Sequence, residues 1–310
     1  MTLPWGRRFL MCPPEHYGVL YEINPWMHRE VAVDLERARD QWEMLAATLR
    51  GAGAEIEVLE PRPGLPDLVF CANAGTLNRG CFVPSRFRHA ERQGEVPHYV
   101  EWFSSHGWEV VSLPDGVSHE GAGDALPMGQ GFVSGYRFRS DAAAHLALSR
   151  LLGAQFRPLE LVDARLYHLD LSLCPLDARA AVVAPDAWDP YGRRMVQALV
   201  ADPIVLERDE VLAFCANSVV VGTTVVMPSC PPRLGRELEA RGFDVAVTPM
   251  DEFQKAGGAC RCLTLALDVA VGVGAPAAEE PEAASLPPAP PSGPPGGDGP
   301  TPSTGGGEAR

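Results

Sequence analysis

The sequence lacks the features that mark several classes of protein. No apolar run approaches the ~20 residues of a membrane helix, and the first ten residues lack the apolar stretch of a signal peptide. Basic residues are too few for general nucleic-acid binding, since 26 Lys and Arg stand against 40 Asp and Glu. We expect a cytoplasmic protein whose partner is neither a membrane nor a nucleic acid, and the sequence leaves a homo-oligomer open.

Paired metal-binding motifs are also missing. The eight cysteines include no C-x-x-C pair, and the only close pair, Cys260 and Cys262, has no H-x-x-x-H partner nearby. A zinc site is therefore not expected. Because the chain is long, nearly half apolar and without an export signal, we expect reduced thiols in place of disulfides.

Large apolar residues are almost absent from the last segment, 275–310, which is rich in Pro, Gly, Ala and Ser. Such a segment buries too little surface to offset the entropy of ordering it. We expect a disordered tail at 275–310 that follows one folded domain at 1–274.

A repeated unit organises the domain. A helical stretch ends at a breaker, and a short apolar strand follows; the breakers are Gly53, Gly107, Gly153, Asp202 and Gly242. The helices show i, i+3, i+4 apolar spacing, and further short strand-like runs come after each unit. Five strand–strand–helix–strand units favour a radial array over a doubly wound sheet, with an ordinary α/β sandwich as the alternative. A radial array would bring one chemical residue per unit together near the strand ends.

Two glycines come shortly before a late cysteine. Gly257 and Gly258 precede Cys262, which leads into an apolar run. Glycine allows unusual backbone angles and the close approach of a ligand. A cysteine after such a loop can be presented to a cleft as a nucleophile, and the alternative is a buried structural cysteine.

The segment 166–173 alternates between apolar and polar residues as a strand does, which predicts that His168 and Asp170 share one face. Histidine can act as a base toward a thiol and as an acid toward a leaving amine near neutral pH. A carboxylate can pair with a guanidinium through two hydrogen bonds. The alternative is a histidine satisfied within the core.

Two carboxylates, Glu120 and Asp124, lie on either side of a Gly-Ala-Gly stretch. The segment lacks the flanking strand and helix of a nucleotide-binding loop. The pattern suits a strand end where the backbone approaches a ligand, and a tight turn with solvated acids is the alternative.

Together these three segments resemble the guanidino-group-modifying enzyme superfamily. The superfamily includes arginine deiminases, dimethylarginine dimethylaminohydrolases, amidinotransferases and arginine dihydrolases. The resemblance covers roughly residues 10–272 and implies an α/β fold, the five-bladed propeller of repeated ββαβ units called a pentein. It implies that 1–274 is the catalytic domain.

The resemblance also implies a role for each residue of the three segments. Cys262 is implied as the nucleophile, His168 as its acid–base partner and Glu120 as the support for the imidazolium. Asp124 and Asp170 are implied as the clamp for the planar guanidinium. No metal and no organic cofactor is implied.

Two asparagines are similar to those of one branch, the bacterial arginine dihydrolases. They are Asn24 in the segment 21–27 and Asn73 in the segment 67–75. We expect an acid in place of Asn73 in deiminases and dimethylargininases. The alternatives are a turn residue for Asn24 and a loop cap for Asn73. An amide can both donate to and accept from a neutral ureido group, whereas a carboxylate only accepts.

An arginine in the segment 135–140 resembles the one with which the family holds the substrate carboxylate. Arg139 fits its spacing, although Arg137 replaces the serine of the family pattern.

The resemblance implies a hydrolase that cleaves C–N bonds of the arginine guanidinium through a covalent cysteine thiouronium intermediate. Two successive hydrolyses would give ornithine, ammonia and carbon dioxide. The alternatives are a dimethylarginine dimethylaminohydrolase that gives citrulline, an amidinotransferase, and a non-catalytic protein that binds arginine-like cations. The expected partner is a small molecule, arginine or methylated arginine.

Overall fold

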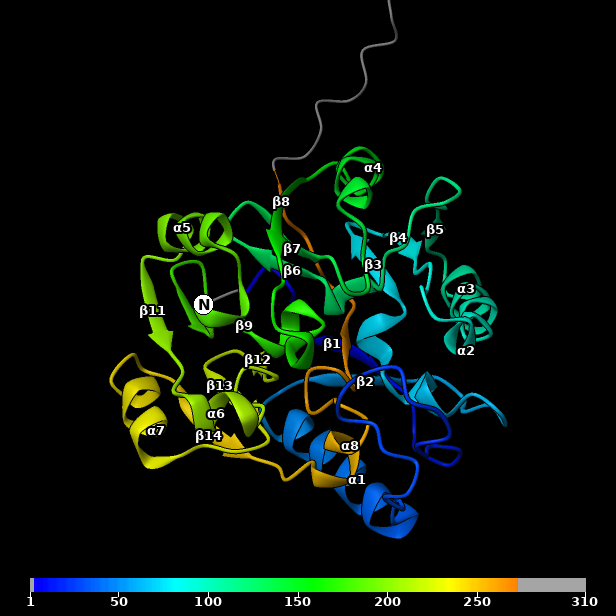
Figure 1. The fold of residues 1–310 in the computed structure, drawn as a ribbon, viewed down its shortest axis with the longest axis horizontal. Helices are drawn as coiled ribbons and strands as arrows, with labels where there is room; N and C mark the ends of the chain where they lie inside the picture. The colour runs from blue at the N-terminus through cyan, green and yellow to red at the C-terminus, as the bar shows by residue number, and fades with distance from the viewer. Residues whose placement is uncertain (1–2, 273–310) are drawn as a thin grey trace, which may run out of the picture. The chain divides into compact units, whose positions relative to one another are not determined.

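The computed structural model describes residues 3–272. Within this range the strands form five three-stranded sheets. Figure 1 shows the sheets around a common centre with the longer helices outside them. The predicted tail, 275–310, lies outside the described residues, so its disorder and the domain boundary at 274 stay predictions.

All five sheets share one pairing pattern, in which the middle strand is antiparallel to an inner strand and parallel to an outer strand. The inner strands are buried and comprise β15 (Leu265–Ala266), β3 (Gly75–Asn78), β6 (Ala125–Met128), β9 (Leu173–Pro175) and β12 (Val219–Val221). The middle strands are β1 (Arg8–Met11), β4 (Cys81–Pro84), β7 (Gly131–Tyr136), β10 (Ala180–Val183) and β13 (Thr224–Met227). The outer strands are β2 (Glu55–Val58), β5 (Glu109–Val110), β8 (Gln155–Glu160), β11 (Asp202–Val205) and β14 (Asp244–Val247).

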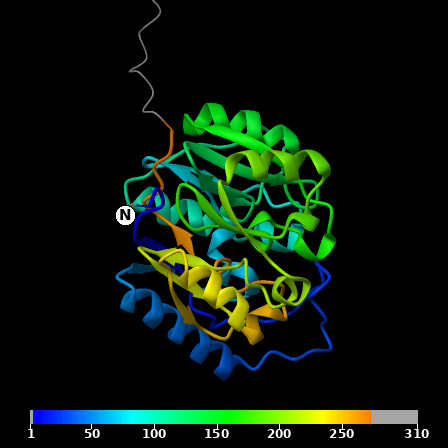
Figure 2. The ribbon, with the colours of Figure 1, turned by 90° about the vertical axis from the view of Figure 1, so that its left-hand side faces the viewer.

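A helix joins each middle strand to its outer strand, because two parallel strands need a crossover connection. These helices are α1 (Leu35–Gly51), α3 (Val96–Ser105), α4 (Ala142–Leu152), α5 (Pro190–Leu199) and α7 (Pro232–Glu239). The side view in Figure 2 also shows helices outside the strands. Shorter helices are α2 (Ala90–Gln93), α6 (Arg208–Leu212) and α8 (Asp251–Gln254). The unit is therefore ββαβ, and the predicted five-bladed α/β propeller is confirmed.

The first blade is completed by the far end of the described chain. Its middle and outer strands, β1 and β2, open the sequence, whereas its inner strand, β15, comes last. This pairing closes the ring of blades. None of the helices within 3–272 is long and apolar enough to cross a membrane.

Helix α1 shows how local sequence makes these units. The Asp34 carboxylate accepts a hydrogen bond from the Arg37 N–H at 3.1 Å and so caps the helix. Leu45 and Leu49, four residues apart, are fully buried on one face. The chain leaves the helix through Gly53, whose φ of 91° is unfavourable for other residues. Gly53 thus acts as the predicted breaker.

Short 3-10 turns precede three of the inner strands. They are η2 (Cys71–Asn73) before β3, η3 (Gly121–Gly123) before β6 and η5 (Leu169–Leu171) before β9; the others are η1 (Pro66–Val69), η4 (Ala164–Leu166) and η6 (Pro185–Ala187). The predicted strand at 166–173 was therefore wrong. The Leu169 N–H donates to the Asp124 carboxylate of another blade at 3.0 Å, which bends the chain before β9 begins. The alternation rule does not apply to such a turn, although His168 and Asp170 are both buried.

Candidate active site

The turn before each inner strand carries a buried polar residue. In chain order of the turns these residues are Asn73, Glu120, His168 with Asp170, Asn217 and Cys262. Each unit therefore brings at least one polar or reactive side chain to the centre, as expected. Asn217 comes from the one unit for which no site residue was predicted.

A small, partly open cavity lies among these turns. Four of the eight predicted site residues line it: Cys262, Asn73, Asn24 and Arg139. The other four, His168, Glu120, Asp124 and Asp170, are almost fully buried beside it. Within residues 3–272 there is no cluster of three or more His, Cys, Asp or Glu side chains that could hold a metal ion.

The two glycines of the nucleophile loop are needed for close packing. A side chain on Gly258 would come within 2.6 Å of the Phe70 ring, and one on Gly257 within 2.8 Å of the Tyr167 hydroxyl. The absence of side chains at these glycines therefore lets neighbouring protein groups pack closely against the loop. This close packing places Cys262 at the cavity wall.

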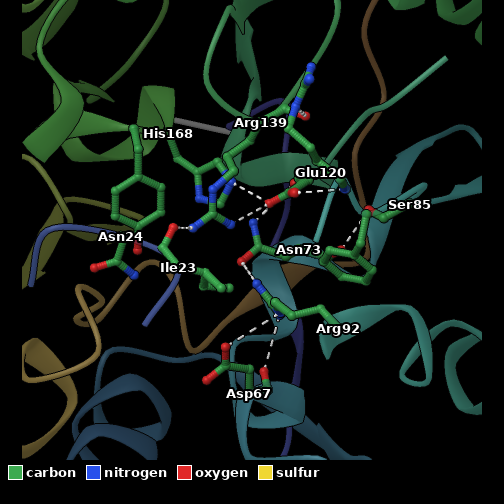
Figure 3. Close-up of polar contacts among 12 residues, drawn as sticks. Ile23, Asn24, Asp67, Asn73, Ser85, Arg92, Glu120, Arg139 and His168 are labelled. Carbon is green, nitrogen blue, oxygen red and sulfur yellow. Dashed lines mark hydrogen bonds and ion pairs between the residues drawn. The ribbon is translucent and has the colours of Figure 1, made fainter. Parts of the chain in front are cut away.

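His168 and Glu120 form a buried pair. His168 Nε2 lies 3.0 Å from Glu120 Oε2, and the same oxygen accepts from Arg139 Nη1 at 2.9 Å (Figure 3). Burial lowers the pKa of His168 to about 4, against the raising effect of Glu120. Burial alone would raise the pKa of Glu120, but Arg139 and His168 outweigh it and hold that pKa below its usual range. Glu120 is thus an anion placed to stabilise a protonated imidazole.

The Cys262 thiol is held between an amide and a carboxylate. Asn217 Nδ2 donates to Sγ at 3.1 Å, and Sγ lies 3.5 Å from Asp170 Oδ2. Burial, followed by the charge of Asp170, raises the pKa of the thiol. Burial raises the pKa of Asp170 itself to about 7, against the opposing charge of Arg261. These surroundings favour the protonated form of the thiol.

Asp124, like Asp170, does not line the cavity, and its predicted place in the guanidinium clamp stays a prediction. Its Oδ1 accepts the Leu169 N–H at 3.0 Å and its Oδ2 accepts from Ser140 Oγ at 2.7 Å. Both oxygens are committed to protein donors, and the side chain is fully buried. The carboxylate holds the turn that follows His168 and leaves Asp170 as the predicted acid beside the nucleophile.

Arg139 lines the cavity but is already paired. Besides Glu120, its guanidinium donates to the Ile23 carbonyl at 2.8 Å and lies over the Tyr167 ring at 4.6 Å. In this arrangement Arg139 supports Glu120, and its predicted contact with a substrate carboxylate stays a prediction.

Asn24 behaves as the turn residue that sequence analysis left open. Its Oδ1 accepts the Trp26 N–H at 2.9 Å and its Nδ2 donates to the Ala256 carbonyl at 3.0 Å. It ties the segment 21–27 to the nucleophile loop and also lines the cavity. Both interpretations therefore have a geometric basis.

Asn73 joins the histidine pair to a second charged group. Its Nδ2 donates to the Glu120 carbonyl at 3.0 Å, and its Oδ1 accepts from Arg92 Nη1 at 2.9 Å. Arg92 also binds both oxygens of Glu95 and the carbonyl of Asp67, as Figure 3 shows in part. Arg92 and Asp67 line the cavity.

Arg92 and Asp67 were not among the predicted site residues, because nothing in their local sequence pattern predicts that they are buried. The other missed residue, Asn217, did have a signal. The tetrapeptide Phe-Cys-Ala-Asn occurs at 70–73, where it ends at Asn73, and again at 214–217, where it ends at Asn217. Both copies directly precede an inner strand.

A five-bladed α/β propeller with a cysteine and a histidine–glutamate pair at its inner turns defines the guanidino-group-modifying superfamily. A family model described as N,N-dimethylarginine dimethylhydrolase, eukaryotic, matches residues 22–269. The chain belongs to this family.

Curated relatives carry two activities. The chain is 42% identical over 263 residues to the bifunctional arginine dihydrolase/ornithine cyclodeaminase AgrE of Nostoc sp.. That match covers 83% of this chain but only 37% of AgrE. The chain is 38% identical over 262 residues to the N(G),N(G)-dimethylarginine dimethylaminohydrolase of Mycobacterium tuberculosis, and the match covers 84% and 86% of the two chains.

Solved structures have the same fold. The substrate-bound N-terminal domain of ArgZ, an arginine dihydrolase of cyanobacteria in a cysteine-to-serine variant, has a TM-score of 0.82 and 39% identity. The match covers 86% of this chain and 99% of that domain. The dimethylaminohydrolase of Pseudomonas aeruginosa, complexed with citrulline, has a TM-score of 0.73 at 20% identity and supports the fold alone.

Proposed function

We propose that this chain hydrolyses the guanidinium group of arginine twice, which gives ornithine, two ammonia and carbon dioxide. The observation that carries the proposal is the cavity, whose wall combines the Cys262 thiol with the amide of Asn73. The thiol supplies a nucleophile and the amide can bind the neutral ureido group formed after the first hydrolysis.

The far groups of the cavity suit an amino acid. Asp67 Oδ1 is buried and has no hydrogen-bond partner within residues 3–272. Arg92, nearby, carries the opposite charge, and its Nε lies 3.8 Å from Asp67 Oδ2. An α-ammonium group could therefore bind Asp67, and an α-carboxylate could bind Arg92 or the predicted Arg139, which both line the cavity. Agmatine, which lacks the carboxylate, should be a poorer substrate than arginine.

The first hydrolysis begins when the guanidinium binds beside Asp170. The cation stabilises both this carboxylate and the thiolate of Cys262, so the thiol loses its proton only when substrate is present. The thiolate then attacks the guanidinium carbon. His168, neutral at first, takes the thiol proton and is then stabilised as an imidazolium by Glu120; it gives that proton to the departing nitrogen, and ammonia leaves.

Water completes the first round. The product of attack is a thiouronium in which the guanidinium carbon is bonded to Sγ. Neutral His168 takes a proton from water, the hydroxide adds to this carbon, and the C–S bond breaks to give citrulline and the thiolate.

A second round acts on the ureido carbon before citrulline leaves. A second ammonia departs, and hydrolysis of the resulting thiocarbamate gives a carbamate that loses carbon dioxide. Arginine and two water molecules thus account for all the atoms of the products. The Asn73 amide supports this round because it can donate to the ureido oxygen.

A second candidate is hydrolysis of dimethylarginine to citrulline, favoured by the family model and by the mycobacterial relative. The test is incubation of the full chain with arginine, dimethylarginine and agmatine, with products identified by mass and Cys262→Ser as the blank. Ornithine from arginine supports the proposal. Release of dimethylamine from dimethylarginine, with no turnover of arginine, would contradict the proposal and support the second candidate. Added amine that captures the amidino group would indicate an amidinotransferase, and no product from any substrate would indicate a binding protein.

A further inference from the structure

One side chain, Asn217, contacts both the backbone and the sulfur of the nucleophile loop. Its Oδ1 accepts the N–H groups of Ala259 at 3.0 Å, Arg261 at 3.1 Å and Cys262 at 3.2 Å. Its Nδ2 donates to Cys262 Sγ at 3.1 Å and to the Asp170 carbonyl at 3.2 Å. Asn217 is fully buried.

The orientation of this amide follows from its partners. Three backbone N–H groups converge on one end of the side chain, and only an oxygen can accept from them. The other end must then be the NH₂ group, which has two hydrogens for its two acceptors. One hydrogen is therefore directed at the sulfur.

The backbone around Asn217 holds the amide in place. The Asn217 N–H donates to the Phe214 carbonyl at 2.9 Å, where Phe214 has a φ of 60°. The Asn217 carbonyl accepts the Arg261 N–H at 3.2 Å, so this residue binds the nucleophile loop twice. The loop and the donor consequently move as one unit.

We infer that Asn217 is a further catalytic residue, the fixed hydrogen-bond donor that stabilises the Cys262 thiolate while its amide oxygen sets the position of the nucleophile loop. The inference rests on the proposed function in so far as Cys262 is the nucleophile. Among the described residues, the sulfur interacts electrostatically with Asp170, Arg261 and Tyr167. The charge of Asp170 destabilises the thiolate, so a hydrogen bond from a neutral donor is needed to offset it.

The test compares the pH dependence of Cys262 alkylation by iodoacetamide in wild type and in Asn217→Asp, read by peptide mass spectrometry from about pH 8 to the highest pH at which both proteins stay folded. The aspartate keeps the acceptor for three N–H groups, which favours its ionised form. It places a carboxylate where the NH₂ group was. The midpoint of alkylation should move about one to two pH units to the alkaline side. The plateau at high pH reports access to the sulfur and should change little.

Asn78→Asp is the matched control. Asn78 is equally buried, and it accepts from the Val271 N–H at 3.0 Å and donates to the Leu152 carbonyl at 2.8 Å. Its hydrogen bonds do not involve the nucleophile loop. The control should leave the Cys262 midpoint where it is in wild type.

A second variant, Asn217→Ala, covers the case in which the aspartate prevents folding. It should shift the midpoint in the same direction. A folded Asn217 variant with the wild-type midpoint, or with alkylation slowed equally at every pH, would overturn the inference and leave Asn217 with a purely structural role. Alkylation needs no substrate, so it tests this inference separately from the proposed function. A protein that does not turn over arginine but shows the shift in midpoint would contradict the proposed function and still support the role of Asn217.

Discussion

Replacing Asn73 by aspartate should change the main product made from arginine from ornithine to citrulline. In the structure the Asn73 Nδ2 donates to the Glu120 carbonyl and its Oδ1 accepts from Arg92. An aspartate keeps the contact with Arg92 but has no hydrogen to donate. The Glu120 carbonyl and the ureido oxygen of the second substrate would both lose their donor.

The size of the effect follows from that lost donor. A hydrogen bond missing from a buried polar group costs about 1–3 kcal/mol, which slows the second hydrolysis roughly tenfold to hundredfold. The first hydrolysis should suffer less, because its substrate is a cation and a further carboxylate favours a cation. Citrulline should then leave before it is attacked again.

The assay is the ratio of citrulline to ornithine over time, measured by mass spectrometry for wild type and Asn73→Asp. Asn78→Asp serves again as the matched control, since it makes the same chemical change in a buried asparagine away from the cavity. An unchanged ratio in a folded, active Asn73→Asp enzyme would refute the role of the amide. A wild type that releases only citrulline would remove the second hydrolysis altogether.

Cys262→Ser should abolish turnover with a near-wild-type melting temperature, whereas Cys260→Ser should stay active because the Cys260 sulfur contacts Thr248 Oγ1 at 3.3 Å; the opposite pattern would exchange their roles. Burial lowers the pKa of His145 to about 4 in the folded protein. As pH falls, His145 is therefore protonated in the unfolded chain at a higher pH than in the folded protein, so the free energy of unfolding should fall as pH drops from about 6.5 to 4. His145→Leu should therefore lose less stability than wild type over that window in thermal melts, and an equal loss would show that this histidine does not contribute. Removing 275–310 should leave activity and melting temperature nearly unchanged, and a fall of several degrees would show that the segment packs on the domain.

The sequence by itself determined the repeated unit and the chemistry-bearing segments. Apolar spacing and breakers such as Gly53 are local properties, and they were enough to predict five strand–strand–helix–strand units. The glycines before Cys262 and the order of the three segments were also visible in one dimension. Strand ends in a radial array converge, which is why the turns could be expected to meet.

Only the tertiary structure decided which polar groups pair. Asp124 was predicted to bind substrate, and in the structure its oxygens accept from Ser140 and from the Leu169 N–H; that second contact turns a predicted strand into a bend. Asn217 lies 45 residues from Cys262 in sequence and touches its sulfur. Hydrogen-bond partners and burial depend on contacts between distant segments, and these contacts shift the pKa values of the thiol and the histidine. A local sequence pattern contains neither the hydrogen-bond partners nor the burial of a side chain. The sequence could therefore identify most of the reacting groups, whereas only the fold determined their contacts and pKa values.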